Sequence, residues 1–170
     1  MSRLTDDLRA AQNGKGMCMN AVELIQHLHR HRAWVNGNLL TAAAEYVWLE
    51  ALLGNEEFIV PGDLPGKLPG NQQGEAGVTD LADLRLKWSE LEEWWTGYLA
   101  RLSSAALEEV VYRKSASLGN RLGVRRSDIL LHVCTHAHYT AAQVVNMLRQ
   151  TGVEKLPETM LISLARHEAT

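Results

Sequence analysis

Apolar side chains recur at three- and four-residue steps along three long stretches of this chain, residues 20–53, 80–102 and 128–150. Such spacing puts about one apolar side chain per helical turn on a single face. The second stretch shows it most fully, at positions Leu81, Leu84, Trp88, Leu91, Trp95, Tyr98 and Leu102. The pattern predicts a mostly helical protein without a substantial sheet, in which these faces form the seams of a bundle.

The segment between the first two stretches, residues 54–79, holds six of the thirteen glycines and three of the four prolines. Proline fixes its own backbone and disfavours helix in the residue before it, so we expect a long loop here. Its apolar residues favour a covering role, either as a lid over a pocket or as a packed crossover between helices. Residues 20–53 are predicted to form one helix, bent near Gly37.

The remaining connections are short. Thr79 or Asp80 can cap the second helix with a side-chain oxygen, and the apolar run VVYRKS at residues 110–115 is expected to be extended. The stretch ASLGNRLGVRR, residues 116–126, is predicted to be a loop. After the third helix, the tail is expected to pack back on the bundle, with Pro157 opening a short turn or helix.

Composition favours a single folded domain, residues 20–170, preceded by a polar lead-in at residues 1–19. A formal charge of -3 is too acidic for a phosphate-tracking surface, so we expect no nucleic-acid partner. Two cysteines cannot form a disulfide framework, and residues 1–19 lack the apolar core of a signal peptide. No stretch is apolar enough for a bilayer span, so a cytoplasmic protein without a membrane partner is predicted.

The stretch LLHVCTHAHYTAAQ, residues 130–143, concentrates polar side chains in the third helix. Apolar spacing predicts that His136 and Thr140 face the core and that His138 is solvated. The full inward seam is expected to be Ile129, Val133, His136, Thr140, Gln143 and Met147. On this geometry a polar lining in the interior would include Thr140 and Gln143, joined by Glu45 and Tyr46 of the first stretch.

His132 and His136 have the i, i+4 spacing by which one helical face offers two imidazoles to a metal ion. Zinc, nickel or iron would require a third protein ligand. Its candidates are His27, His29, His31, Glu45 and Cys134. Without such a ligand, His136 is a hydrogen-bonded core histidine. The other cluster, HLHRHR at residues 27–32, is predicted to be a solvated and mildly basic patch.

Four sequence boxes resemble the DinB/YfiT-like superfamily. The last-helix run LLHVCTHAHYTAAQVVNMLRQTGV is similar to that family's H-x-x-x-H-x-x-Y-H-R-G-Q signature, and LPETMLISLAR to its closing L-P-x-T-D-L-I. HRAWVNGNLL and AAEYVWL resemble its first-helix and second-helix boxes. The boxes stand in the family's order and span most of residues 20–166. The resemblance implies an antiparallel up-down four-helix bundle of DinB type, completed or extended by dimerisation.

The same resemblance implies a divalent metal held by three histidines, but the ligand positions depart from it. The first last-helix ligand falls on His136, whereas the second falls on Thr140 and the helix-two ligand on Leu40. Trp34 and Trp48 of the first two boxes are also only fourteen residues apart. Either the first two family helices are fused, or a segment carried by relatives is absent.

Two functions remain open from the sequence. The first is a metal-free DinB-like bundle that binds a small molecule or dimerises, with a degenerate metal site. The second, implied by the resemblance, is a divalent-metal-dependent enzyme, a thiol S-transferase or hydrolase-like protein, using His136 and His132. A homodimer is expected in either case, because the shortened first half leaves apolar surface that one chain does not bury.

Overall fold

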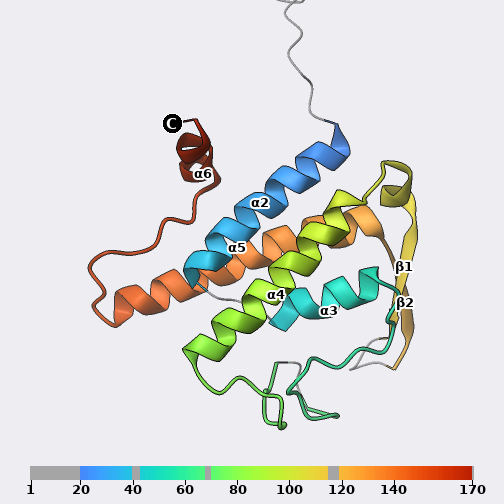
Figure 1. Cartoon of the computed structure of the whole chain (residues 1–170), viewed down its shortest axis with the longest axis horizontal. Helices are drawn as coiled ribbons and strands as arrows, with labels where there is room; N and C mark the ends of the chain where they lie inside the picture. The colour runs from blue at the N-terminus through green and yellow to red at the C-terminus, as the bar shows by residue number, and fades with distance from the viewer. Residues whose placement is uncertain (1–19, 40–42, 68–69, 115–118, 170) are drawn as a thin grey trace, which may run out of the picture.

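The computed structural model describes residues 20–39, 43–67, 70–114 and 119–169, and the side chains of 33–39 and 43–44 are left undescribed. The protein is mostly helical, with one small sheet (Figure 1). Its elements are α2 (Ala21–Leu39), α3 (Ala43–Leu52), α4 (Leu81–Ala100), the 3-10 helix η1 (Ala105–Glu108), β1 (Val110–Lys114), β2 (Arg121–Arg125), α5 (Arg126–Gln150) and α6 (Leu161–Glu168). The predicted lead-in at 1–19 lies outside these residues.

The prediction of one bent helix over residues 20–53 is wrong, because α2 and α3 are separate helices that run in different directions (Figure 1). One continuous helix would hold residues 32 and 45 about 20 Å apart. Arg32 instead forms an ion pair with Glu45, and both side chains are buried. Residues 32 and 45 therefore do not lie on one continuous helix, which rules out the fused-helix alternative.

Helix α4 confirms the seam that the sequence predicts. Its start is capped by Asp80, whose carboxylate accepts a hydrogen bond from the backbone N–H of Asp83 at 2.9 Å. The buried positions are Trp88, Leu91, Trp95, Tyr98 and Leu99. They join Ile25 of α2, Leu49 and Leu52 of α3, and Ile129, Leu130 and Val133 of α5 in one hydrophobic core. The start of the predicted seam lies outside that core, since Leu81 is exposed, whereas Leu102 at its end packs against the core.

Helix α5 follows its predicted seam only over the first two turns. Ile129 and Val133 are buried, but the stripe then continues through Ala137 and Ala141 instead of His136 and Thr140. His136 and Thr140 are only half-buried, and Gln143 and Met147 are exposed. α5 packs against α2 and α3, and small alanines allow close approach between helices. Their small side chains give a weak apolar signal, and the prediction missed them for that reason.

The segment after α4 forms a two-stranded antiparallel hairpin, in which Val110 pairs with Arg125 and Lys114 with Arg121. The extended run at 110–114 is confirmed, whereas the loop predicted for 116–126 is wrong at Arg121–Arg125. Every residue of β2 is exposed. The strand therefore shows no alternation of buried and exposed side chains, and its pairing with β1 decides its structure. Arg121 also binds Glu56 through two hydrogen bonds of 2.7 Å.

Between α3 and α4, the described part of the predicted loop contains no helix or strand. It lies along one end of the molecule, beside α3 and the start of α4 (Figure 1). At the other end of the chain, α6 packs near α2, where the ring nitrogen Nε2 of His31 lies 3.0 Å from the backbone oxygen of Thr159. Within the described ranges, no helix has the length and apolar character needed to cross a membrane.

Candidate functional site

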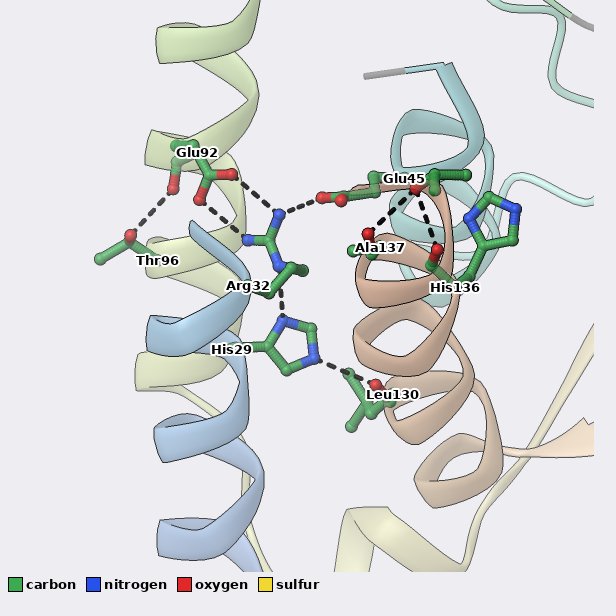
Figure 2. Close-up of polar contacts among 9 residues, drawn as sticks. His29, Arg32, Glu45, Glu92, Thr96, Leu130, His136 and Ala137 are labelled. Atoms are coloured by element: carbon green, nitrogen blue, oxygen red, sulfur yellow. Dashed lines mark hydrogen bonds and ion pairs between the residues drawn. The ribbon is translucent and has the colours of Figure 1, made fainter. Parts of the chain in front are cut away.

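A buried charged cluster joins three helices of the core. Arg32 of α2 makes two hydrogen bonds of 2.8 Å to the two carboxylate oxygens of Glu92 on α4, and its Nη1 also binds Glu45 of α3. Figure 2 shows the guanidinium lying between the two carboxylates. The side chains of Arg32 and Glu45 are 1% and 3% exposed, and that of Glu92 is 21% exposed. Burial would lower the pKa of Arg32, but Glu45 and Glu92 raise it above its usual value.

His29 supports the guanidinium from below (Figure 2). The Nε–H of Arg32 donates to Nδ1 of His29 at 3.2 Å. Because arginine can only donate, Nδ1 is the accepting nitrogen and the imidazole proton is on Nε2. That proton is donated to the backbone oxygen of Leu130 on α5, 3.2 Å away. Burial, and then the charge of Arg32, lower the pKa of His29 to about 3, so this imidazole is neutral.

The prediction that residues 27–32 form a solvated patch is therefore wrong. His29 and Arg32 are each 2% exposed, and His31 is also buried, whereas His27 is partly exposed. The counter-charges come from α3 and α4, which no local pattern in residues 27–32 reveals. One guanidinium is shared by two carboxylates in this cluster. Pairing of this kind fixes the positions of α2, α3 and α4 relative to one another, because a buried charge that loses its partner destabilises the fold.

A cavity of about 250 Å³ opens between α2 and α4 beside this cluster. Its walls are formed by Gln26, His29, Arg30, Arg32, Glu92, Trp95, Thr96, Leu99 and Ala100. Trp95 is fully buried, and its ring lies under the guanidinium of Arg32 and beside the imidazole of His29. Its indole Nε1–H has no hydrogen-bond partner among the described residues. An unpaired buried donor costs about 1–3 kcal/mol, and one that lines a cavity can be satisfied by a molecule bound there.

Most other polar groups on the cavity wall are already engaged. The side-chain amide of Gln26 donates to the backbone oxygen of Leu99 at 3.0 Å. The hydroxyl of Thr96 donates to the backbone oxygen of Glu92 at 2.8 Å. Arg30 lies toward solvent, 3.8 Å from Glu168. The cavity therefore has largely apolar walls, with Trp95 among its wall residues and an arginine at its mouth. It suits a small molecule that carries a hydrogen-bond acceptor.

The two histidines predicted to bind metal lie elsewhere. The rings of His132 and His136 are adjacent, with centroids 5.7 Å apart, and His132 packs edge-on against Trp48 of α3. Figure 2 shows His136 projecting from the side of α5 away from Arg32. Burial, and then His132, lower the pKa of His136. Within the described part of the chain, no group of three His, Cys, Asp or Glu side chains is arranged to hold a metal ion.

The candidate third ligands are spread over separate places. Glu45 is engaged with Arg32, and His29 with Arg32 and Leu130. The ring centroids of His31 and His138 are 6.0 Å apart, and His138 is exposed as predicted. Cys134 is half-buried near Arg32 and Glu45, and burial raises the pKa of its thiol to about 12. Leu40, aligned with the family's helix-two ligand, lies outside the described residues. The donor set therefore does not fit the three-histidine centre that the resemblance implies.

The predicted pocket lining is likewise divided. Glu45 belongs to the charged cluster, whereas Tyr46 lines a different cavity, under the loop. The hydroxyl of Thr140 donates to backbone oxygens of its own helix, at His136 and Ala137, and Gln143 is exposed. The prediction missed Arg32, Glu92 and Trp95 as site residues. The one local signal was an arginine three residues after a histidine on a helix that otherwise contributes apolar residues to the core.

Comparison of the chain with protein-family models, with curated proteins and with solved structures gave no match. The function must therefore be inferred from the site itself.

Proposed function

We propose that this protein is a DinB-like helical bundle that binds a small molecule in the cavity between α2 and α4. The observation that carries the proposal is the buried indole N–H of Trp95, a residue of the cavity wall, because this N–H lacks a partner among the described residues. Buried donors are almost always satisfied by protein, water or ligand. A ligand with a carbonyl or carboxylate oxygen would supply the missing acceptor.

The charged cluster holds residues of the cavity wall in place and does not itself bind the ligand. Nε of Arg32 is committed to His29, and its two terminal nitrogens to Glu45 and Glu92. The guanidinium in turn fixes the indole ring that lies against it, with 5.3 Å between Arg32 Cζ and the ring centroid. A preorganised donor in an apolar wall favours binding because little has to be ordered when the ligand enters.

The test follows the indole N–H signals of ¹⁵N-labelled protein during titration with benzamide, benzoate and toluene. Benzamide and benzoate carry an acceptor oxygen, and toluene shares the ring without one. We expect the Trp95 signal to shift downfield with the two acceptors and not with toluene. The exposed Trp94, its neighbour in α4, serves as an internal control and should keep its position. An unmoved Trp95 signal, or equal responses to all three probes, would refute the proposal.

A matched pair of variants locates the binding. Ala100 is exposed and lines the cavity, so Ala100→Phe should block the mouth and abolish the Trp95 shift. Ala82 is exposed on the same helix outside the cavity, and Ala82→Phe should leave the shift unchanged. A shift that survives Ala100→Phe would place the probe elsewhere.

The second candidate is a divalent-metal-dependent enzyme, in which a metal on His132 and His136 would activate a thiol or a water. The adjacent rings of these histidines favour it. Two imidazoles without a third protein ligand weigh against it, because tight zinc sites use at least three. Elemental analysis of untagged protein, purified without added metal, decides between the two candidates. Stoichiometric zinc, nickel or iron that is lost in His136→Gln would support the enzyme.

A further inference from the structure

A second cavity, of about 320 Å³, lies under the loop between α3 and α4. Its walls are formed by Tyr46 of α3, Val60, Pro61, Gln72 and Val78 of the loop, and Leu84, Lys87, Glu90 and Leu91 of α4. The walls are mainly aliphatic, with four polar side chains among them. Which of these four are free to contact a bound molecule decides what the cavity can recognise.

The loop that roofs this cavity is held by its own hydrogen bonds. The carboxylate of Asp63 accepts the backbone N–H groups of Gly70 and Gln72 at 2.6 and 2.9 Å. Gly62 has a φ of +88°, and a side chain there would meet the backbone of Gly77 at 2.5 Å. This close backbone contact requires glycine at position 62. The described part of the roof is therefore a folded structure held by hydrogen bonds and backbone contacts of its own.

Two of the four polar side chains are consumed in holding this roof. Lys87 has three ammonium protons, and its Nζ lies within hydrogen-bond distance of the backbone oxygens of Ala76 and Gly77 and of the Asp83 carboxylate, at 3.0, 3.2 and 2.9 Å. Gln72 donates through Nε2 to Pro61 and Asp63, and its Oε1 accepts the N–H of Val78. The donors of both side chains are therefore used within the protein, and Asp83 neutralises the charge of Lys87.

The other two, Tyr46 and Glu90, have no hydrogen bond or ion pair within the described ranges. Burial raises the pKa of Tyr46, and the carboxylates of Glu50 and Glu90 raise it further. The Tyr46 ring is fixed by stacking on Phe58 at 5.2 Å and by an edge contact with Trp94 at 5.6 Å. The free groups are thus a carboxylate at the rim and a positioned phenol.

We propose that this cavity binds a small organic cation, an ammonium group on an apolar body. The ammonium would pair with the Glu90 carboxylate and donate to the Tyr46 hydroxyl, while the body lies against Val60, Leu84 and Leu91. An anion would meet only negative charge, because Lys87 is already neutralised. A neutral apolar molecule would leave the carboxylate without a partner. This site is separate from the cavity between α2 and α4, and its inference does not rest on the function proposed above.

The test compares three probes that share a phenylethyl body, namely phenethylammonium, 2-phenylethanol and 3-phenylpropanoate. Calorimetric titration of the full chain at pH 7 gives their dissociation constants. We expect the cation to bind at least about tenfold more tightly than the alcohol, the gain typical of one hydrogen bond to a charged group, and the anion to bind most weakly. Nuclear Overhauser contacts from the bound cation should reach the methyl groups of Val60 and Leu84.

Matched variants locate the charge. Glu90→Gln should weaken binding of phenethylammonium about tenfold while leaving the alcohol unaffected. Glu93→Gln, one turn further along α4 and outside the cavity wall, should bind as the wild type does. Both positions are exposed, so both variants should fold, which circular dichroism verifies.

Several results would overturn this proposal. They are equal affinities for the three probes, failure of the cation to bind, and wild-type affinity in Glu90→Gln. Saturation with benzamide separates this site from the cavity between α2 and α4, because it should leave phenethylammonium binding unchanged. Competition between the two would place the cation beside Trp95 and refute a separate site. Failure of benzamide to shift Trp95 would refute the earlier proposal alone.

Discussion

At the residue scale, the charge of Arg32 governs the stability of the core. Replacing Arg32 with Met leaves Glu45 buried without its cation, which typically costs 3–5 kcal/mol. We expect Arg32→Met to lower the free energy of unfolding by about this amount in urea titrations. Arg32→Met combined with Glu45→Gln should recover part of the loss, since the orphaned charge is removed. Arg30→Met, an exposed change on the same helix, should cost under about 1 kcal/mol. A loss in Arg32→Met no larger than in Arg30→Met would contradict the account.

His29 makes stability depend on pH. Its folded-state pKa, about 3, lies below the ordinary histidine value of 6.5. Between these values the unfolded chain binds the proton more readily, so the stabilising contribution is full above pH 6.5 and is lost as pH falls toward 3. From pH 7 to pH 5 this one group should reduce the free energy of unfolding by about 2 kcal/mol. Denaturant titrations should show a shallower dependence in His29→Gln, and parallel curves for the two proteins would exclude this role.

At the element scale, Asp80 fixes the start of α4 and therefore the position of its buried tryptophans. Asp80→Ala removes the acceptor for the N–H of Asp83, and we expect it to destabilise the protein by about 1 kcal/mol. Ser104→Ala is the matched control, because Ser104 precedes η1 without making a side-chain capping bond. Thermal unfolding compares the two variants. Equal melting temperatures would show that the Asp80 cap contributes nothing measurable.

The loop over the second cavity shows how a feature predicted from sequence acquires a use in the folded chain. Its glycines and prolines predict a long non-helical segment, and the described residues agree. The sequence pattern does not reveal the contact between Gly62 and Gly77. It also does not reveal that Lys87 of α4 binds backbone oxygens of the loop. The choice between lid and crossover is not made by composition, because both require the same residues.

At the scale of the whole molecule, apolar side chains remain exposed on the helical surface. Tyr139 and Met147 of α5 are 65% and 62% exposed, and Met160 and Ile162 near α6 are 56% and 55% exposed. Apolar surface of this kind favours association between copies. We therefore predict a homodimer, measured as twice the chain mass by light scattering at micromolar concentration. Substituting both Tyr139 and Met147 with Lys should give a folded monomer if α5 forms the interface, and a wild-type monomer would dismiss the prediction.

The sequence by itself determined the elements whose signals are local. The steps from Trp88 to Tyr98 fix the inner face of α4, and Asp80 marks its start, because helical period and capping depend on residues a turn apart. What it could not determine depends on residues distant in the chain. Arg32 is buried with Glu45 and Glu92, which reach it from two other helices, and Ala137 is buried on a helix that packs against α2 and α3. Only the tertiary structure determined which residues form the site, because a charged side chain is buried only where distant residues supply its partners, and no local pattern specifies those partners.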